Sequence, residues 1–127
     1  MSTYLADTHA LWWAAYEPNR LGRDAARVLS ESPDVFASVA SIWEITIKVS
    51  LGKLRLRGSV SSFASELREQ GIETLPIRPD HVFAIADLPF HHRDPFDRLL
   101  IAQAMREKMT LLTCDEAFAA YGVKTLW

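Results

Sequence analysis

Short apolar runs alternate with longer amphipathic stretches along the chain, and this alternation constrains the fold more than any other feature. A parallel sheet covered by helices produces such a pattern, because its strands are buried on both faces and are joined by helical crossovers. The expected strands are residues 3–6, 35–37, 73–76, 110–113 and 125–126. The expected helices follow Asp7 and cover residues 23–31, 59–70, 79–86, 95–108 and 116–121. The sequence therefore predicts an α/β fold.

One segment, residues 43–51, fits two structures. Its apolar residues alternate strictly, which by itself predicts a half-buried strand: Trp43, Ile45, Ile47, Val49 and Leu51. A helix capped by Ser38 would instead place Glu44 and Lys48 at the favourable i, i+4 spacing and would end at Gly52. We prefer the helix, mainly because of the family resemblance described below.

Size and composition narrow the class of protein. A length of 127 residues with 49% hydrophobic residues suits one domain covering residues 1–127. The net charge of −2 argues against binding nucleic acid through bulk electrostatics, so any RNA contact must be local. The single cysteine, Cys114, excludes an internal disulfide and a cysteine zinc site. With no signal peptide or spanning segment recognised, we expect a cytoplasmic protein without membrane contact.

Acidic residues follow two of the expected strands. Asp7 and Asp115 each lie between a strand and a helix, at the sheet edge where ligands of open parallel sheets bind. Asp97, in the first turn of its helix, is expected near the same edge of the sheet. If segment 43–51 is helical, the carboxylate of Glu44 can point into the same space. Clustered carboxylates raise each other's pKa unless a cation lies among them. Oxygen ligands suit Mg²⁺ or Mn²⁺, whose chemistry favours phosphoryl transfer.

Ordinary structural roles compete with this interpretation. Asp94 precedes Pro95 and has the position of an N-cap, while Asp97 and Asp115 could serve only as negative charges at helix starts. Glu44 could pair with Lys48 on a solvated face. A run without acidic residues could contact phosphate or be simply solvated: Lys48, Lys53, Arg55 and Arg57.

Four stretches together resemble the PIN-domain ribonucleases, most closely the VapC toxin branch of bacterial and archaeal toxin–antitoxin modules. They are ADTHALWW (6–13), SVASIWEITIKVSLGKL (38–54), HRDPFDRLLIAQA (92–104) and LLTCD (111–115), in the family's order and spacing. The resemblance implies a three-layer α/β/α, Rossmann-like PIN fold with a central five-stranded parallel sheet. It also implies an Mg²⁺- or Mn²⁺-dependent endoribonuclease, a cognate antitoxin, a homodimer and a hetero-oligomer with the antitoxin.

The resemblance also assigns residues. The family's four acids correspond to Asp7, Glu44, Asp97 and Asp115, and Asp94 resembles an extra acid that is often structural. Thr8 and Thr113 match hydroxyl positions that orient a water or a ligand, or that form hydrogen bonds at strand ends. Arg98 matches a residue that meets phosphate or holds an acid in place. Cys114 departs from the family pattern, in which other residues, some of them basic, occur at this position.

Two other functions were compared with this one. A signalling receiver domain would need an acidic pair after the first strand, but Ala6 precedes Asp7. A catalytically silent PIN-like module would lack an acid, whereas all four are present. Of Trp12 and Trp13, one is expected in the core and the other in an apolar groove for a partner. His91 and His92 are interpreted as loop residues, His92 being only a weak candidate for a contact near the site.

Overall fold

The computed structural model describes residues 2–127, and its five strands form a single parallel sheet. The strands are β1 (Tyr4–Ala6), β2 (Val35–Ser38), β3 (Ile72–Leu75), β4 (Thr110–Leu112) and β5 (Thr125–Leu126). Their order is β3-β2-β1-β4-β5, and every neighbouring pair is parallel. The predicted α/β class and the five-stranded parallel sheet are confirmed, although β3 begins and ends one residue earlier than predicted.

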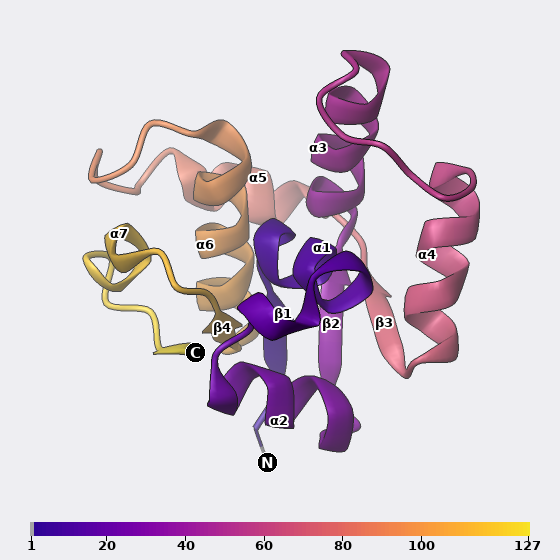
Figure 1. The fold of residues 1–127 in the computed structure, drawn as a ribbon. Coiled ribbons are helices and arrows are strands. Elements are labelled where there is room, and N and C mark those ends of the chain that lie inside the picture. Colours follow the sequence, from indigo (N-terminus) through magenta and orange to yellow (C-terminus); the bar gives the residue numbers. More distant parts are fainter. Residues whose placement is uncertain (1) are drawn as a thin grey trace.

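The helices cover both faces of this sheet (Figure 1). They are α1 (Thr8–Tyr16), α2 (Arg23–Glu31), α3 (Val39–Ser50), α4 (Val60–Glu69), α5 (Pro79–Ile85), α6 (Pro95–Glu107) and α7 (Glu116–Ala119), with a short 3₁₀ turn at Pro18–Arg20. No helix in residues 2–127 has the length and apolar character needed to cross a membrane. The helices expected from the sequence are all present, with ends that differ by one or two residues.

Alternating strand residues build two separate cores, one on each face of the sheet. Leu5 and Leu111 point into the core that α5 and α6 cover. The next residues along these strands, Ala6 and Leu112, point into the core covered by α1, α2 and α4. This period of two is the strand geometry expected for a sheet buried on both faces, and it produces the three layers.

The ambiguous segment 43–51 is helical and belongs to α3. Ser38 caps this helix, with its Oγ accepting the backbone N–H of Ala40 at 3.0 Å. The alternating apolar pattern was misleading because Trp43 and Leu51 are 55% and 64% exposed. The buried positions follow helical spacing instead: Ala40, Ser41, Glu44 and Ile45. Helix formation therefore turns Glu44 into the protein, whereas a strand would have placed it opposite Trp43 and Ile45.

Candidate active site

The strand order places a crevice between β1 and β4. The chain adds β2 and β3 on one side of β1 and then β4 and β5 on the other. Ligands of open α/β sheets bind at such a switch point, outside the carboxyl ends of the strands. Asp7 follows β1 directly, and Asp115 lies three residues beyond the end of β4. The backbone N–H of Asp7 donates to the carbonyl of Leu112 at 3.1 Å, which joins the ends of the two strands.

Asp7 is the most deeply buried of the predicted acids, with 3% of its surface exposed. It caps α1, because its Oδ1 accepts the backbone N–H of Ala10 at 2.8 Å. Burial raises the pKa of Asp7, and the charge of Asp115 adds to this effect. Hydrogen bonds from Thr113 and Ala10 favour the ionised form and offset part of the shift in this pKa. The Asp7 carboxylate would therefore gain stability from a nearby cation.

Glu44 projects from α3 and is 7% exposed. Its Oε2 lies 3.1 Å from the Nζ of Lys48, one turn along the helix. Its Oε1 is buried and has no hydrogen-bond partner among the described residues. A buried carboxylate oxygen without a partner is costly, since it has lost its water without replacing it. Glu44 thus has both the ion pair with Lys48 and a free oxygen available for a ligand.

Asp97 lies in the first turn of α6, three residues after the N-cap residue Asp94. Burial and then the charge of Asp94 raise the pKa of Asp97 to about 7. The carboxylates of Glu44 and Asp7 raise this pKa further, whereas His92 lowers it. These mutual effects show that acids from α1, α3 and α6 lie within electrostatic reach of one another.

His92 joins Asp97 to Asp115. Its Nε2 lies 3.1 Å from Oδ2 of Asp97 and 3.2 Å from Oδ2 of Asp115. The other oxygen of Asp115, Oδ1, accepts the backbone N–H of Ala117 at 2.9 Å and caps α7. Sequence reasoning gave His92 little weight, and the available signal was its position two residues before the Asp94 cap. The structure thus adds an imidazole to the predicted acids.

The residues expected to support the acids have different surroundings. Asp94 is an N-cap, as predicted, and its Oδ1 accepts the backbone N–H groups of Phe96 and Asp97. The hydroxyl of Thr8 donates to Ser41 Oγ at 2.9 Å and so ties α1 to α3. Thr113 accepts the backbone N–H of Asp115 at 3.1 Å. Both threonines therefore hold the elements that carry acids.

Arg98 is not among the side chains that meet at the acids. Its guanidinium is buried and donates to the carbonyl of Pro89 at 2.8 Å and to the hydroxyl of Tyr121 at 3.2 Å. It also donates to two carbonyls near the end of α5 and lies 4.1 Å from the ring centre of Phe90. The expected contact with phosphate or with an acid has no support in this geometry, because Arg98 binds the α5–α6 loop instead.

The predicted basic residues are also dispersed. Lys48 pairs with Glu44, and Arg57 donates to the carbonyl of Ala15 at 3.0 Å while lying over the ring of Tyr16. Lys53 and Arg55 are in the exposed segment between α3 and α4. Within residues 2–127, these two candidates for phosphate contacts form no ion pair with an acidic side chain.

Trp12 and Trp13 lie next to each other on α1 but have different neighbours. Trp12 packs against the second core and stacks on Tyr16, with ring centres 4.3 Å apart. Trp13 lies beneath the guanidinium of Arg20 and meets the edge of Trp127. Both indoles are only partly exposed because neighbouring side chains cover them. Trp12 is therefore the indole that packs against the core, and the partner groove expected beside the other indole stays a prediction.

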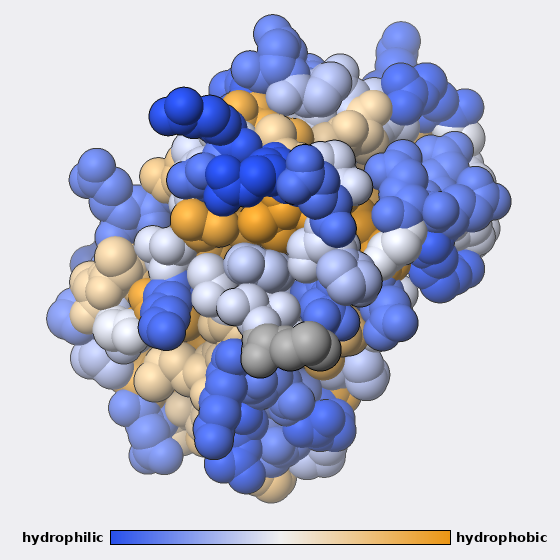
Figure 2. Space-filling model, turned by 90° about the horizontal axis from the view of Figure 1, so that it is seen from below, coloured by the Kyte–Doolittle hydropathy of each residue, from blue (hydrophilic) through white to orange (hydrophobic). Residues whose placement is uncertain are grey.

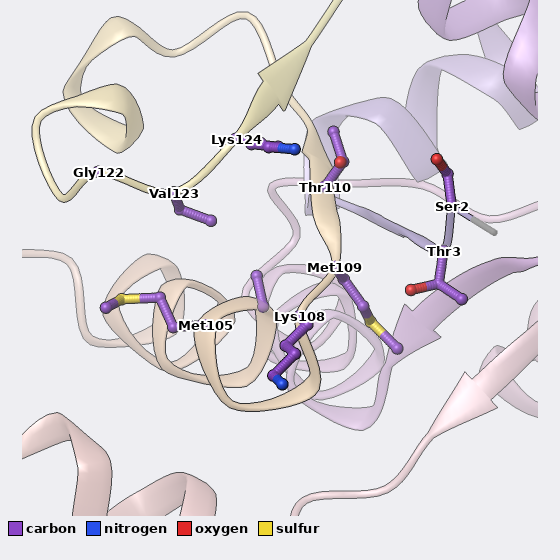
Figure 3. A pocket seen from close by; sticks show the side chains of 10 residues that line it. Ser2, Thr3, Met105, Lys108, Met109, Thr110, Gly122, Val123 and Lys124 are labelled. Atoms are coloured by element: carbon purple, nitrogen blue, oxygen red, sulfur yellow. The ribbon is translucent and has the colours of Figure 1, made fainter.

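A hollow of about 450 Å³ lies away from the acids. Its lining comes from the segments just before β1, β4 and β5 and includes Lys108 and Lys124 (Figure 3). Seen from below, where the strands begin, the surface is mainly hydrophilic around a central hydrophobic band (Figure 2). No acidic residue lines this hollow, so its size gives no information about the carboxylate cluster at the opposite edge of the sheet.

The carboxylate cluster has the donor set of a hard divalent cation. Its carboxylates come from four separate elements, and a buried oxygen of Glu44 has no partner among residues 2–127. Burial and the charges of Asp94, Glu44 and Asp7 raise the pKa of Asp97. Mg²⁺ and Mn²⁺ prefer oxygen ligands of this kind. A cation is the group that these residues fit best.

The comparisons with known proteins agree with this geometry. A sequence model of the PIN domain family matches residues 4–124. Ribonuclease VapC22 of Mycobacterium tuberculosis is 27% identical over 122 residues, which cover 95% of this chain and 93% of the relative. The structure of VapBC2 from Rickettsia felis, bound to a DNA fragment from their promoter, matches with a TM-score of 0.73 at 14% identity and covers 98% and 97% of the two chains. FitAcB from Neisseria gonorrhoeae matches with a TM-score of 0.66 at 22% identity and the same coverage.

Proposed function

The chain belongs to the PIN domain family, and from this premise we propose that it is a metal-dependent endoribonuclease. The observation that carries the proposal is the convergence of carboxylates from four elements. Burial and the charges of Asp94, Glu44 and Asp7 raise the pKa of Asp97 to about 7. The charge of Asp115 in turn raises the pKa of Asp7. The similarity to Ribonuclease VapC22 along nearly the whole chain supports RNA as the substrate.

Asp7, Glu44, Asp97 and Asp115 would hold Mg²⁺ or Mn²⁺. The chemistry supplied by such a cation is the activation of a water molecule and the stabilisation of negative charge on the phosphodiester. The residues themselves orient the site, since Asp7 and Asp115 are fixed as helix caps and Glu44 is held by Lys48. Cleavage by water would leave a 5′-phosphate and a 3′-hydroxyl. Lys53 and Arg55 could contact the RNA backbone next to the site.

Substitution of Asp97 tests this role against that of a helix-start charge. Asp97→Asn keeps the size of the side chain but removes its charge. We expect cleavage of RNA to slow on the order of 100-fold, which corresponds to ~3 kcal/mol of lost transition-state stabilisation. The Mg²⁺-induced rise in Tm should also shrink, because the metal then stabilises the folded protein less.

Asp87→Asn is the matched control, because Asp87 is an exposed aspartate in the α5–α6 loop and is not one of the clustered acids. It should cleave RNA at the wild-type rate, and EDTA should stop cleavage by both the control and the wild type. If Asp97→Asn cleaves normally and shows an unchanged Mg²⁺ shift, Asp97 is only a helix-start residue. Full cleavage in EDTA would contradict the dependence on metal.

We further propose that the protein is the toxin of a toxin–antitoxin module and that a cognate antitoxin binds it as a hetero-oligomer. The similarity to Ribonuclease VapC22 and to the VapBC2 and FitAcB structures supports this proposal. A basic side chain of the antitoxin could occupy the cation position among the acids. Homodimerisation, which the family resemblance implies, stays a prediction.

Expression in a host cell tests the toxin role. The wild type should arrest growth, Asp97→Asn should not, and co-expression of a small protein encoded directly upstream should restore growth. Normal growth with abundant, soluble and nuclease-active wild-type protein would contradict the toxin role but would leave the ribonuclease proposal intact.

A further inference from the structure

The contacts of the His92 imidazole determine which of its two ring nitrogens carries the proton in the neutral form. Its Nδ1 accepts the backbone N–H of Asp94 at 3.1 Å, so this nitrogen carries the lone pair. In the neutral ring the proton must then be on Nε2, which faces Asp97 and Asp115. A lone pair on Nε2 is what a metal would need from this nitrogen. His92 is therefore arranged to donate a hydrogen bond to Asp115, with Asp97 3.1 Å from the same nitrogen, rather than to bind a cation itself.

The Asp97 carboxylate has fewer other contacts than the carboxylates of the remaining acids. Asp7 and Asp115 are both held by backbone N–H groups at helix starts, and Glu44 is held by Lys48. Within residues 2–127, the polar contact of the Asp97 carboxylate is with Nε2 of His92 at 3.1 Å, because the cap of α6 is Asp94. Each carboxylate oxygen has two lone pairs, so accepting this N–H leaves room for a cation.

The loop that carries His92 is itself fixed by buried groups. The hydroxyl of Tyr121 accepts the backbone N–H groups of His91 and His92 at 3.1 and 2.8 Å. Arg98 donates to the same hydroxyl and to the carbonyl of Pro89, at the other end of this loop. The position of the imidazole is therefore determined by contacts made with α6 and with the residue just beyond α7.

We propose that His92 is a positioning residue, which holds the carboxylates of Asp97 and Asp115 in the arrangement that binds the cation. This inference rests on the proposed function. Groups that hydrogen-bond to metal ligands fix the ligand's orientation, and their loss typically lowers metal affinity about 10–100-fold. His92 would act in the same way, through Asp97 and Asp115 and without touching the cation.

Two substitutions distinguish the contact of Nε2 with the acids from the hydrogen bond that Nδ1 accepts within the loop. His92→Asn can keep the acceptor for the Asp94 N–H but is too short to reach the acids. His92→Gln can keep a donor near the position of Nε2. We expect His92→Asn to bind Mn²⁺ about 10-fold more weakly, which corresponds to about 1.4 kcal/mol. His92→Gln should recover most of this affinity, and both variants should unfold cooperatively in EDTA.

Calorimetric titration of the metal-free protein with MnCl₂ measures these affinities. Electron spin echo spectroscopy of the Mn²⁺-loaded wild type should detect no directly coordinated nitrogen. A nitrogen signal that His92→Asn removes would make His92 a ligand and overturn the inference. Unchanged affinity in His92→Asn would also overturn it, and tighter binding would show that His92 competes with the cation.

The same titration distinguishes this inference from the proposed function. A wild type that binds neither Mn²⁺ nor Mg²⁺ would contradict both. A wild type that binds the metal and cleaves RNA, with the same affinity in His92→Asn, would contradict only the role of His92. If His92 served only to hold the loop, both substitutions should change the metal affinity to a similar extent, because neither exposes a core group. Recovery of the affinity in His92→Gln but not in His92→Asn would therefore indicate that the contact with the acids is what matters.

Discussion

The charge of Asp97 makes the stability of the metal-free protein depend on pH. The pKa of this carboxyl is about 7 in the folded protein and 3.8 in its ordinary state, mainly because of burial. At pH values between these two pKa values, the Asp97 carboxyl is deprotonated in the unfolded chain but still protonated in the folded protein. The folded state binds more protons, so this contribution to stability falls as pH rises through the window and stays low above it.

Asp97→Asn should remove this dependence. In EDTA, its stability relative to the wild type should increase from about pH 4 to about pH 7 and then level off. The gain should reach at least ~1 kcal/mol, since one pKa unit corresponds to about 1.4 kcal/mol. Urea unfolding at several pH values measures it, with Asp87→Asn as the control that should follow the wild type. A constant difference between Asp97→Asn and wild type would show that Asp97 ionises normally.

At the scale of single elements, the first backbone N–H groups of α2 are hydrogen-bonded by Trp127. The carbonyl of Trp127 accepts the backbone N–H groups of Asp24 and Ala25 at 3.0 and 3.2 Å, which satisfies two of the free donors at this helix start. The N-cap is Gly22, which offers no side chain for this purpose. Packing of Trp127 against Trp13 then connects α2 to α1, the helix whose N-cap is Asp7.

Gly22→Ala should disrupt this contact. A Cβ on Gly22 would lie 2.5 Å from backbone and ring atoms of Trp127, which have little freedom to move. Overpacking of this kind costs about 1–3 kcal/mol, and thermal unfolding should show the loss. Gly58→Ala is the control, because its Cβ would mainly meet the movable hydroxyl of Ser62. Equal Tm values for the two variants would show that Trp127 moves away at little cost.

At the scale of the whole molecule, a chain of polar contacts joins the end of β2 and the start of α3 to α5 and α6. Ser38, the cap of α3, donates to Oε1 of Gln103 on α6 at 2.5 Å. Nε2 of Gln103 lies 3.3 Å from Nδ1 of His81 on α5. His81 also accepts the backbone N–H of Arg78 at Nδ1, so its Nε2 donates to Glu107. These contacts hold the helix that carries Glu44 against the helix that carries Asp97.

Ser38→Ala should therefore destabilise the protein more than loss of an ordinary cap. It removes the cap of α3 and the hydrogen-bond donor of Gln103 Oε1, for a total of about 2–4 kcal/mol. Ser59→Ala removes an exposed cap, that of α4, and should cost about 1 kcal/mol. Chemical denaturation of both variants measures the difference. Similar losses would mean that water replaces Ser38 as the partner of Gln103.

The sequence by itself determined the α/β class, the number of strands and the order of elements, because hydrophobic period and helix caps are local. The start of α6 is an example, since Asp94 and Pro95 indicate the cap that the structure contains. The family motifs also identified the four acids, although their role as metal ligands stays a prediction. For the segment 43–51, the alternating pattern by itself predicted the wrong structure. The Ser38 cap, the Glu44–Lys48 spacing and, above all, the resemblance favoured the helix that is observed up to Ser50.

Only the tertiary structure decided which polar side chains share an environment. His92 meets Asp97 and Asp115 because Tyr121 and Arg98 hold its loop, and these residues are distant in sequence. Arg98 follows an acid in the sequence but points to the α5–α6 loop, and Arg20 and Trp127 cover Trp13. Local patterns predict elements because backbone preferences act over a few residues, whereas side-chain partners depend on how distant elements pack.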